Sequence, residues 1–129
     1  MKLNYYKATT DQHFWFISSL FRSPNVKYFL TKKISVRELK ELNRSPRRND
    51  YILLANNKNI GWFNIRQSVN PKEGSFGVII DKSYQGKGYG KQAMEIIERE
   101  ARRLGIKNMK LEVIETNERA IKLYGGDRL

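Results

Sequence analysis

In the first third of the chain, apolar residues recur at helical spacing after a short extended segment. Residues 3–8 predict a strand, and residues 11–21 predict a helix with one apolar face. Ser35, followed three residues later by Glu38, forms a capping-box pattern and predicts a short helix that ends near Asn43. A polar loop is expected over residues 44–50.

The period changes to two at residue 51, where apolar and polar residues begin to alternate. Residues 51–55 and 60–66 predict the two strands of a β-hairpin, with its turn at residues 56–59. Residues 75–80 predict a third strand of the same group.

The last third returns to a helical period. Residues 88–104 predict a long amphipathic helix, and Gly105 stands where a helix-terminating glycine is expected. Residues 109–114 predict a strand, and residues 117–124 a helix with Asn117 as its N-cap. The whole order predicts an α/β (α+β) fold: a mixed sheet with helices on both faces, and a parallel crossover around the long helix.

Length and composition limit the classes of protein to consider. A chain of 129 residues with 40% hydrophobic residues fits one domain, residues 1–129. The 25 Lys and Arg against 13 Asp and Glu give a net charge of +12, which favours anionic partners. Without an apolar run of about 18 residues we expect no membrane span. We expect a cytoplasmic location.

Two residue counts exclude several kinds of chemistry. The chain has no cysteine, which excludes disulfides, thiolate metal sites and a Cys nucleophile. Its only histidine, His13, lies among aromatic residues, where packing or surface exposure is expected rather than catalysis. A multi-histidine metal centre is excluded as well, so we expect no metal site.

The segment with the most chemical information is the glycine-rich loop of residues 81–91, between a predicted strand and the long helix. A helix N-terminus presents backbone N–H groups and a positive dipole, which together bind phosphate. Glycine lets the backbone approach such an anion closely, and Lys87 and Lys91 add positive charge. The spacing matches neither the Walker phosphate loop nor the dinucleotide pattern G-x-G-x-x-G.

The spacing that fits is Q-x-x-G-x-G, formed by Gln85, Gly88 and Gly90. It resembles the acetyl-CoA pyrophosphate loop of the GNAT family of N-acetyltransferases. A second string, N-x-x-A-I-x-L-Y from Asn117 to Tyr124, is similar to another block of that family. Two motifs in the same order and elements make the resemblance specific over about residues 50–124.

The resemblance implies a GNAT acyl-CoA N-acyltransferase fold, with acetyl-CoA as cosubstrate and an amine as acetyl acceptor. The acceptor could be a small molecule or a protein amine. In the family the strand before the loop binds the pantetheine arm, and the loop binds the pyrophosphate. The cofactor-binding residues implied here are Val78, Ile79, Ile80, Gln85, Gly86, Lys87, Gly88, Tyr89, Gly90, Lys91 and Asn117.

Two residues are the candidates for catalysis. The resemblance implies that Tyr124 donates a proton to the departing thiolate, because a phenol stays protonated at neutral pH. Glu112, on the preceding strand, is the candidate base. The oxyanion donor is expected to be a backbone N–H within residues 78–80. Lacking a cysteine, the chain should work by direct attack of the amine in a ternary complex.

The chain ends five residues after Tyr124, earlier than the resemblance leads one to expect. We therefore expect a C-terminally shortened fold with one sheet edge uncovered. A truncation, a homodimer that covers the edge, and a cofactor-binding remnant all fit this pattern.

The acceptor pocket is harder to predict. Candidate pocket or rim residues combine aromatic, apolar and basic side chains: Phe29, Leu30, Arg47, Arg48, Trp62 and Phe63. The aromatic residues Phe14, Trp15 and Phe16 are expected in the core instead.

Two other functions remain open. The charge of +12, with Arg44, Arg47 and Arg48 close together, would suit a nucleic-acid-binding module, although no recognition motif is present. A GNAT-fold protein that binds acetyl-CoA without catalysis is the other alternative.

Overall fold

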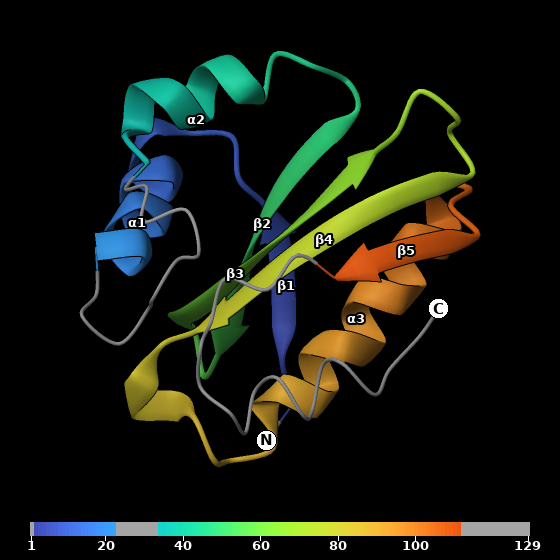
Figure 1. The fold of residues 1–129 in the computed structure, drawn as a ribbon. Helices are drawn as coiled ribbons and strands as arrows, with labels where there is room; N and C mark the ends of the chain where they lie inside the picture. Colours follow the sequence, from blue (N-terminus) through green and yellow to red (C-terminus); the bar gives the residue numbers. More distant parts are fainter. Residues whose placement is uncertain (1, 23–33, 112–129) are drawn as a thin grey trace.

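The computed structural model describes residues 2–22 and 34–111 (Figure 1). Its centre is one mixed sheet with the strand order β1-β2-β3-β4-β5. The strands are β1 Asn4–Lys7, β2 Arg48–Ala55, β3 Lys58–Gln67, β4 Glu73–Ile80 and β5 Asn108–Leu111. The helices are α1 Asp11–Arg22, α2 Val36–Leu42, the 3-10 turn η1 Lys82–Tyr84 and α3 Tyr89–Arg103.

The sheet is antiparallel from β1 to β4 and parallel between β4 and β5. The long helix α3 makes the connection between the two parallel strands, as the sequence predicts (Figure 1). The mixed α+β architecture is therefore confirmed. The predicted helix of residues 117–124 and the end of the predicted strand 109–114 lie outside the described residues.

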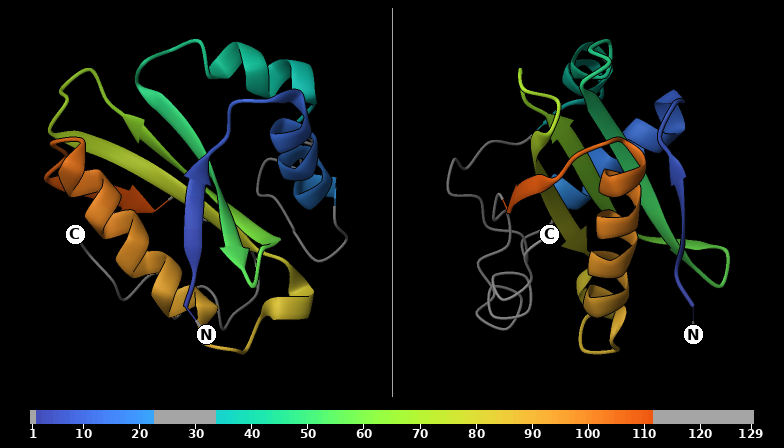
Figure 2. Two further views of the ribbon diagram at one scale, coloured as in Figure 1. Left: turned by 180° about the vertical axis from the view of Figure 1, so that it is seen from behind. Right: turned by 90° about the vertical axis from the view of Figure 1, so that its right-hand side faces the viewer.

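Helices cover both faces of the sheet, and each face has its own core (Figure 2). Alternate residues of a strand point to opposite faces. Phe63, Ile65 and Val78 belong to the core beneath α3, whereas Ile52, Trp62 and Ile79 belong to the core beneath α1 and α2. We call these the α3 face and the α1/α2 face.

The strand β2 begins earlier than the sequence predicts. Residues 48–50 were expected in a polar loop, but they pair with residues 66–64 of β3 in regular antiparallel register. Asp50 is fully buried there. The prediction is wrong because alternating polarity indicates a strand with one buried apolar face and one solvent-exposed face. This end of β2 buries polar side chains instead, so its sequence does not alternate.

The hairpin turn is also tighter than predicted. Only Asn56 and Asn57 connect the strands, and both have positive φ angles, 51° and 61°. Two left-handed residues make a type I′ turn, whose twist matches that of the flanking strands. Asparagine tolerates this conformation better than most residues, so the strand pairing extends to Ala55 and Lys58.

The predicted helix caps are present. The Ser35 side chain accepts from the Glu38 N–H, and the Glu38 carboxylate accepts from the Ser35 N–H, which completes the capping box of α2. At the end of α3, Gly105 has φ 86° and its N–H donates to the Arg102 carbonyl, while the Ile106 N–H donates to the Ala101 carbonyl. These two bonds form a Schellman motif.

The aromatic run at the start of α1 is only partly core. Phe14 is buried and Phe16 partly buried against the α1/α2-face core, but Trp15 is 65% exposed. The expectation that all three aromatics are core is therefore wrong for Trp15. Successive helix positions are about 100° apart, so a helix that lies on a sheet cannot bury three residues in a row. His13 is a local cap instead: its Nδ1 accepts from the Thr9 and Thr10 N–H groups.

On the α3 face, a buried carboxylate joins the helix to the sheet. Glu100 accepts hydrogen bonds from the Tyr51 hydroxyl at 2.6 Å and the Tyr5 hydroxyl at 3.3 Å. Arg103 donates to both of its oxygens, at 2.7 and 2.8 Å. We call Tyr5, Tyr51, Glu100 and Arg103 the Glu100 cluster.

The Glu100 cluster shifts the acidity of its members. The hydrogen bonds from Arg103 hold the pKa of Glu100 below its ordinary value, against the opposing effect of burial. Burial and the neighbouring Glu100 carboxylate raise the pKa of Tyr51 well above that of a free phenol, and raise the pKa of Tyr5 as well. Tyr51 and Glu100 are therefore neutral and ionised, respectively, at neutral pH.

No helix within residues 2–22 and 34–111 is long and apolar enough to cross a membrane. In the same residues, no group of three or more His, Cys, Asp or Glu side chains could hold a metal ion.

Candidate functional site at the open edge of β4

The strand β4 has an edge that its neighbour covers only in part. Its first half pairs with β5, from Glu73 opposite Asn108 to Phe76 opposite Leu111. Its second half, from Gly77 to Ile80, pairs with β3 alone among the described strands. Within residues 2–22 and 34–111, the backbone groups of this second half that point away from β3 face no partner strand, which makes them candidates for binding a ligand.

The register shows which backbone groups these are. The Asp81 N–H donates to the Ile60 carbonyl at 2.8 Å, and antiparallel pairing repeats every two residues. Ile79 and Gly77 thus direct their N–H groups toward β3, whereas Val78 and Ile80 direct theirs toward the open edge. In agreement, the Ile80 carbonyl accepts from the Gln85 side chain at 2.9 Å rather than from β3.

The side chains of this strand end belong to the sheet core. Val78, Ile79 and Ile80 are all buried, with Ile79 on the face opposite to the other two. A ligand at the edge would therefore meet their backbone only. The residue types matter because they fix the strand, not because they contact the ligand.

Beyond β4, the glycine loop turns directly into α3. Gly86 and Gly88 have φ angles of 77° and 83°, a region that other residues rarely adopt. Gly88 is the N-cap of α3 and offers no side chain to cap it. A Cβ built on Gly88 would meet no atom within 4 Å, so the space in front of the helix is open.

The charges around the loop suit an anion. Lys87 and Lys91 are exposed, and the Lys87 ammonium lies 5.5 Å from the centre of the Tyr84 ring. The positive end of the α3 dipole lies at the same place. This combination of open space, backbone N–H groups and positive charge is typical of a phosphate site.

Two of the predicted binding residues have their side chains engaged elsewhere. The Gln85 amide ties the loop to the end of β4 through the Ile80 carbonyl. Tyr89 is buried in the α3-face core, next to Tyr84 at a ring distance of 6.4 Å. The Tyr89 side chain therefore lies in the core, so a contact with the ligand would come from its backbone.

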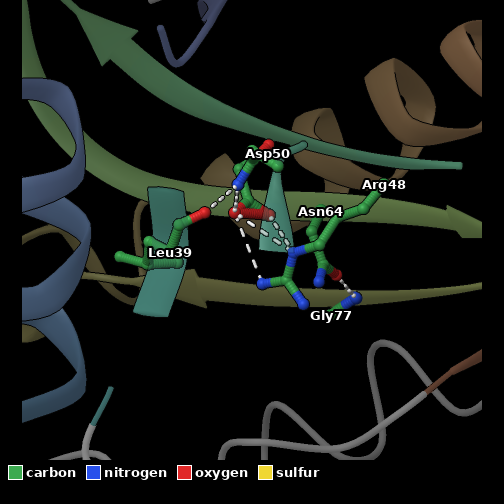
Figure 3. Close-up of polar contacts among 6 residues, drawn as sticks. Leu39, Arg48, Asp50, Asn64 and Gly77 are labelled. Carbon is green, nitrogen blue, oxygen red and sulfur yellow. Dashed lines mark hydrogen bonds and ion pairs between the residues drawn. The ribbon is translucent and has the colours of Figure 1, made fainter. Parts of the chain in front are cut away.

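Polar side chains line the α1/α2 face of the sheet beside the open edge (Figure 3). Asp50 on β2 lies opposite Asn64 on β3, which in turn lies opposite Gly77 on β4. The Asn64 Oδ1 atom accepts from the Gly77 N–H at 2.7 Å, and both groups are buried. These paired residues thus lead from β2 to Gly77, the residue of β4 that follows the last pair with the described part of β5.

Asp50 has partners from two elements. The Asn43 amide, at the end of α2, donates to its Oδ2 at 2.9 Å, and Arg48 Nη2 lies 3.3 Å from the same oxygen. Arg48 Nε lies 3.3 Å from Oδ1. We call Asn43, Arg48, Asp50 and Asn64 the Asp50 cluster.

The structure corrects part of the predicted acceptor pocket. Trp62 and Phe63 were expected at a pocket or rim, but both are fully buried. Trp62 packs edge-on against Phe21 on one face, and Phe63 stacks on Tyr51 at 4.5 Å on the other. Adjacent strand residues cannot share a face, so they could not line one pocket.

The basic residues of the predicted pocket have different surroundings. Arg47 is exposed, whereas Arg48 is mostly buried in its contact with Asp50. Several predicted residues lie outside the described part of the chain: the catalytic candidates Glu112 and Tyr124, the cofactor candidate Asn117, and the pocket candidates Phe29 and Leu30.

Sequence reasoning missed Asn64 and Asp50. For Asn64 a signal was available, because it lies in the predicted strand 60–66 at a position where the alternation calls for an apolar residue. A polar residue at such a position needs a hydrogen-bond partner, and the partner lies on another strand. Asp50 fell in the predicted polar loop, where no such signal exists.

Comparison with known proteins identifies the family. The model of the Acetyltransferase (GNAT) family matches residues 10–125. The chain belongs to the GNAT acetyltransferases. The similarity spans both the glycine loop and the N-x-x-A-I-x-L-Y block, and the GNAT resemblance predicted from these motifs is confirmed.

A protein of similar sequence and a solved structure of similar fold are both described as N-acetyltransferases. An uncharacterized N-acetyltransferase of Bacillus subtilis, YycN, is 33% identical over 107 residues, which are 78% of this chain and 67% of that protein. Spermidine N-acetyltransferase from Vibrio cholerae, solved in complex with CoA and spermine, has a TM-score of 0.80 at 21% identity. That similarity covers 97% of this chain and 79% of the other.

A third relative acts on a protein. The ribosomal-protein-S18-alanine N-acetyltransferase of Escherichia coli has a TM-score of 0.72 at 20% identity, over 96% of this chain and 75% of the other. Together the comparisons show a GNAT fold and a GNAT-type acetyltransferase, whose family uses acetyl-CoA as cosubstrate. The open β4 edge and the uncapped glycine start of α3 fit the pantetheine and pyrophosphate of that cosubstrate.

Proposed function

We propose that residues 1–129 form a single catalytic domain that transfers the acetyl group of acetyl-CoA to a primary amine by direct attack. The observation that carries the proposal is the continuity of the open β4 edge with the glycine loop at the start of α3. An extended amide arm fits along a free strand edge, and a pyrophosphate fits a helix N-terminus. This chain offers both within residues 77–91.

In the proposed complex, the backbone of Val78 and Ile80 binds the pantetheine arm. The loop from Gln85 to Lys91 binds the pyrophosphate through backbone N–H groups, with Lys87 and Lys91 adding charge. Gln85 acts by holding the loop against β4. Asn117 is proposed to hydrogen-bond the cosubstrate.

The reaction forms a C–N bond and breaks the C–S bond of the thioester. The neutral amine attacks the carbonyl carbon, and the Val78 N–H, which faces the open edge, stabilises the oxyanion. Collapse of the tetrahedral species expels the CoA thiolate, which takes a proton from Tyr124. Glu112 accepts the proton that the amine loses, directly or through a water molecule.

Primary amines are the acceptor class that we propose. The relatives named above include a spermidine N-acetyltransferase and an alanine N-acetyltransferase of a ribosomal protein. A polyamine and a protein N-terminus are both primary amines, so the screen should include both kinds. We also propose a cytoplasmic protein. A homodimer is proposed as the arrangement that would cover the sheet edge expected from the early end of the chain, leaving the β4 edge to the cosubstrate.

The test measures release of the CoA thiol with spermidine and an N-terminal alanine peptide as acceptors. We expect Tyr124→Phe to lower kcat by about 100-fold, with acetyl-CoA binding unchanged. Tyr6→Phe is the matched control, because the Tyr6 hydroxyl bonds Asn59 near the start of β3 and has no part in the proposed mechanism.

Other results of this experiment would favour other functions. Acetyl-CoA binding without turnover of any acceptor would favour a non-catalytic member of the family. No acetyl-CoA binding, together with salt-sensitive binding of DNA or RNA, would favour the nucleic-acid module. The burial of Arg48 against Asp50 already removes one residue from the basic cluster on which that alternative depends.

A further inference from the structure

The side chain of Asn64 holds the backbone of β4 immediately before the proposed oxyanion donor. Asn64 and Gly77 lie directly opposite each other in the β3–β4 register, and the Asn64 Oδ1 accepts from the Gly77 N–H at 2.7 Å. Gly77 is followed by Val78, whose N–H faces the open edge. Gly77 has no side chain of its own to anchor it.

The position of this bond along β4 is specific. Phe76 is the last residue of β4 that pairs with the described part of β5, which ends at Leu111. Within residues 2–22 and 34–111, only β3 pairs with β4 from Gly77 on. The buried Asn64 side chain adds an anchor at Gly77 to the backbone pairing of the two residues.

We propose that Asn64 is a positioning residue for acetyl transfer, which fixes Gly77 so that the Val78 N–H points at the thioester carbonyl. This inference rests on the proposed function. A displacement of about 1 Å at a reacting group costs about 100-fold in rate. The hydrogen bond that the Gly77 N–H donates to the buried Asn64 side chain is a means to prevent such a displacement.

The strand geometry supports a role in orientation rather than in binding. Asn64 lies on the α1/α2 face with Trp62 and is buried. The pyrophosphate loop is connected to β4 at Ile80, three residues beyond Gly77, through Gln85. Loss of the Asn64 bond should thus change the direction of the Val78 N–H and leave the phosphate contacts of the cosubstrate intact.

The test uses Asn64→Leu, which removes the acceptor, and Asn64→Asp, which keeps an oxygen opposite Gly77. Asn49→Leu is the matched control, because Asn49 is a buried asparagine of β2 on the opposite face of the sheet. The first readout is the carbonyl stretching frequency of acetyl-CoA labelled with 13C at the thioester carbon. It requires no acceptor amine.

A hydrogen bond to the carbonyl lowers its stretching frequency. We expect the lowered frequency in the wild type, in Asn64→Asp and in Asn49→Leu, and a return toward the free value in Asn64→Leu. The Kd for acetyl-CoA should stay within about threefold in all four proteins. We expect kcat to fall about 100-fold in Asn64→Leu alone.

A second readout follows the amide itself. Hydrogen exchange at the Gly77 N–H should accelerate in Asn64→Leu relative to that at Ile79, which faces β3 in the same ladder. If Asn64→Asp does not fold, the comparison of the two leucine variants still decides the question.

The possible failures are distinguishable. If Asn64→Leu keeps the wild-type carbonyl frequency and kcat, Asn64 is merely structural and the inference is wrong, while the proposed function stands. If the wild type itself binds no acetyl-CoA, the proposed function fails, and this inference with it, before any variant is compared.

Discussion

Two clusters of buried polar groups lie on opposite faces of the same sheet, and they differ in how completely they are hydrogen-bonded. In the Glu100 cluster on the α3 face, both carboxylate oxygens have donors, from Tyr51, Tyr5 and Arg103. In the Asp50 cluster on the α1/α2 face, the Oδ1 atoms of Asp50 and Asn43 have no well-aligned donor among the described residues. Every carboxylate oxygen of the Glu100 cluster is thus hydrogen-bonded, whereas two acceptor atoms of the Asp50 cluster lack an aligned donor among the described residues.

The two clusters also connect different parts of the fold. The Glu100 cluster connects β1 and β2 to the long helix and has no group near the open edge of β4. The Asp50 cluster includes Asn64, which bonds the strand on which the proposed chemistry takes place. A network whose members are all hydrogen-bonded rigidifies a fold, whereas each buried polar group without a partner calls for an explanation.

The largest expected effect on stability is that of Glu100→Leu. The change leaves the Tyr51 hydroxyl buried without its acceptor, so we expect the free energy of unfolding to fall by about 2–3 kcal/mol. The acetyl-CoA Kd should stay unchanged. Urea denaturation and calorimetry measure the two quantities.

Glu98→Leu is the matched control on the same helix, because Glu98 forms an exposed ion pair with Arg102. It should cost no more than about 1 kcal/mol. Equal losses in the two variants, or a weakened cosubstrate affinity in Glu100→Leu, would contradict the division of roles between the two faces.

The Glu100 cluster should make the free energy of unfolding fall at both acid and alkaline pH. The pKa of Glu100 is lowered on folding, so its contribution is complete above its ordinary value of 4.5 and is lost as the pH falls through the folded value. The pKa of Tyr51 is raised, so its contribution is complete below the ordinary value of 10.0 and is lost as the pH rises above it.

Urea unfolding across the pH range measures both limbs. Glu100→Gln should flatten the acid limb, and Tyr51→Phe should flatten the alkaline limb while lowering the plateau by about 2 kcal/mol. Limbs that keep the wild-type slope in both variants would show that other groups control them.

A smaller loss of stability is expected for Ser35→Ala on the α1/α2 face. The change removes one half of the capping box of α2 and should cost about 1 kcal/mol. Because α2 ends at Asn43, which donates to Asp50, this helix supports the Asp50 cluster. Thermal unfolding gives the loss, and a variant as stable as the wild type would show that the cap is not needed.

The smallest effect is expected for Trp15→Ser. Its side chain is mostly exposed on α1, so the free energy of unfolding should change by less than about 0.5 kcal/mol. Chemical denaturation tests this directly. A loss of several kcal/mol would restore the core position that the sequence predicts for Trp15.

Most elements of the fold could be predicted from the sequence alone. The helices, the hairpin and the β4–α3–β5 crossover follow from local periodicity and from caps such as Ser35 and Gly105. The spacing of Gln85, Gly88 and Gly90 predicts a phosphate site at the start of α3, and this stays a prediction. These signals lie within a few residues of one another along the chain.

The polar clusters could not be predicted in this way, because their members are far apart in sequence. Tyr5 and Glu100 are separated by 95 positions, and Asn64 and Gly77 by 13. The same is true of residues 48–50, whose polar side chains suggest a loop until β3 provides their strand partners. The local sequence pattern predicts the helices and strands. The hydrogen-bond partners of each buried polar group depend on which strands pair, and the local pattern does not contain this information.

The central claim is that the glycine start of α3 binds the cosubstrate, and a titration with acetyl-CoA tests it most directly. The proteins to compare are the wild type, Gly88→Glu and Gly105→Glu. Gly88 and Gly105 flank α3, have nearly equal positive φ angles of 83° and 86°, and have open space where a Cβ would lie. Each substitution therefore imposes the same backbone strain and adds the same charge.

We expect the wild type and Gly105→Glu to bind acetyl-CoA with equal affinity. Gly88→Glu should bind at least about 100-fold more weakly, because its carboxylate would occupy the pyrophosphate site and repel it. Equal binding by the two glutamate variants, or no binding by the wild type, would show that the start of α3 is not the cosubstrate site.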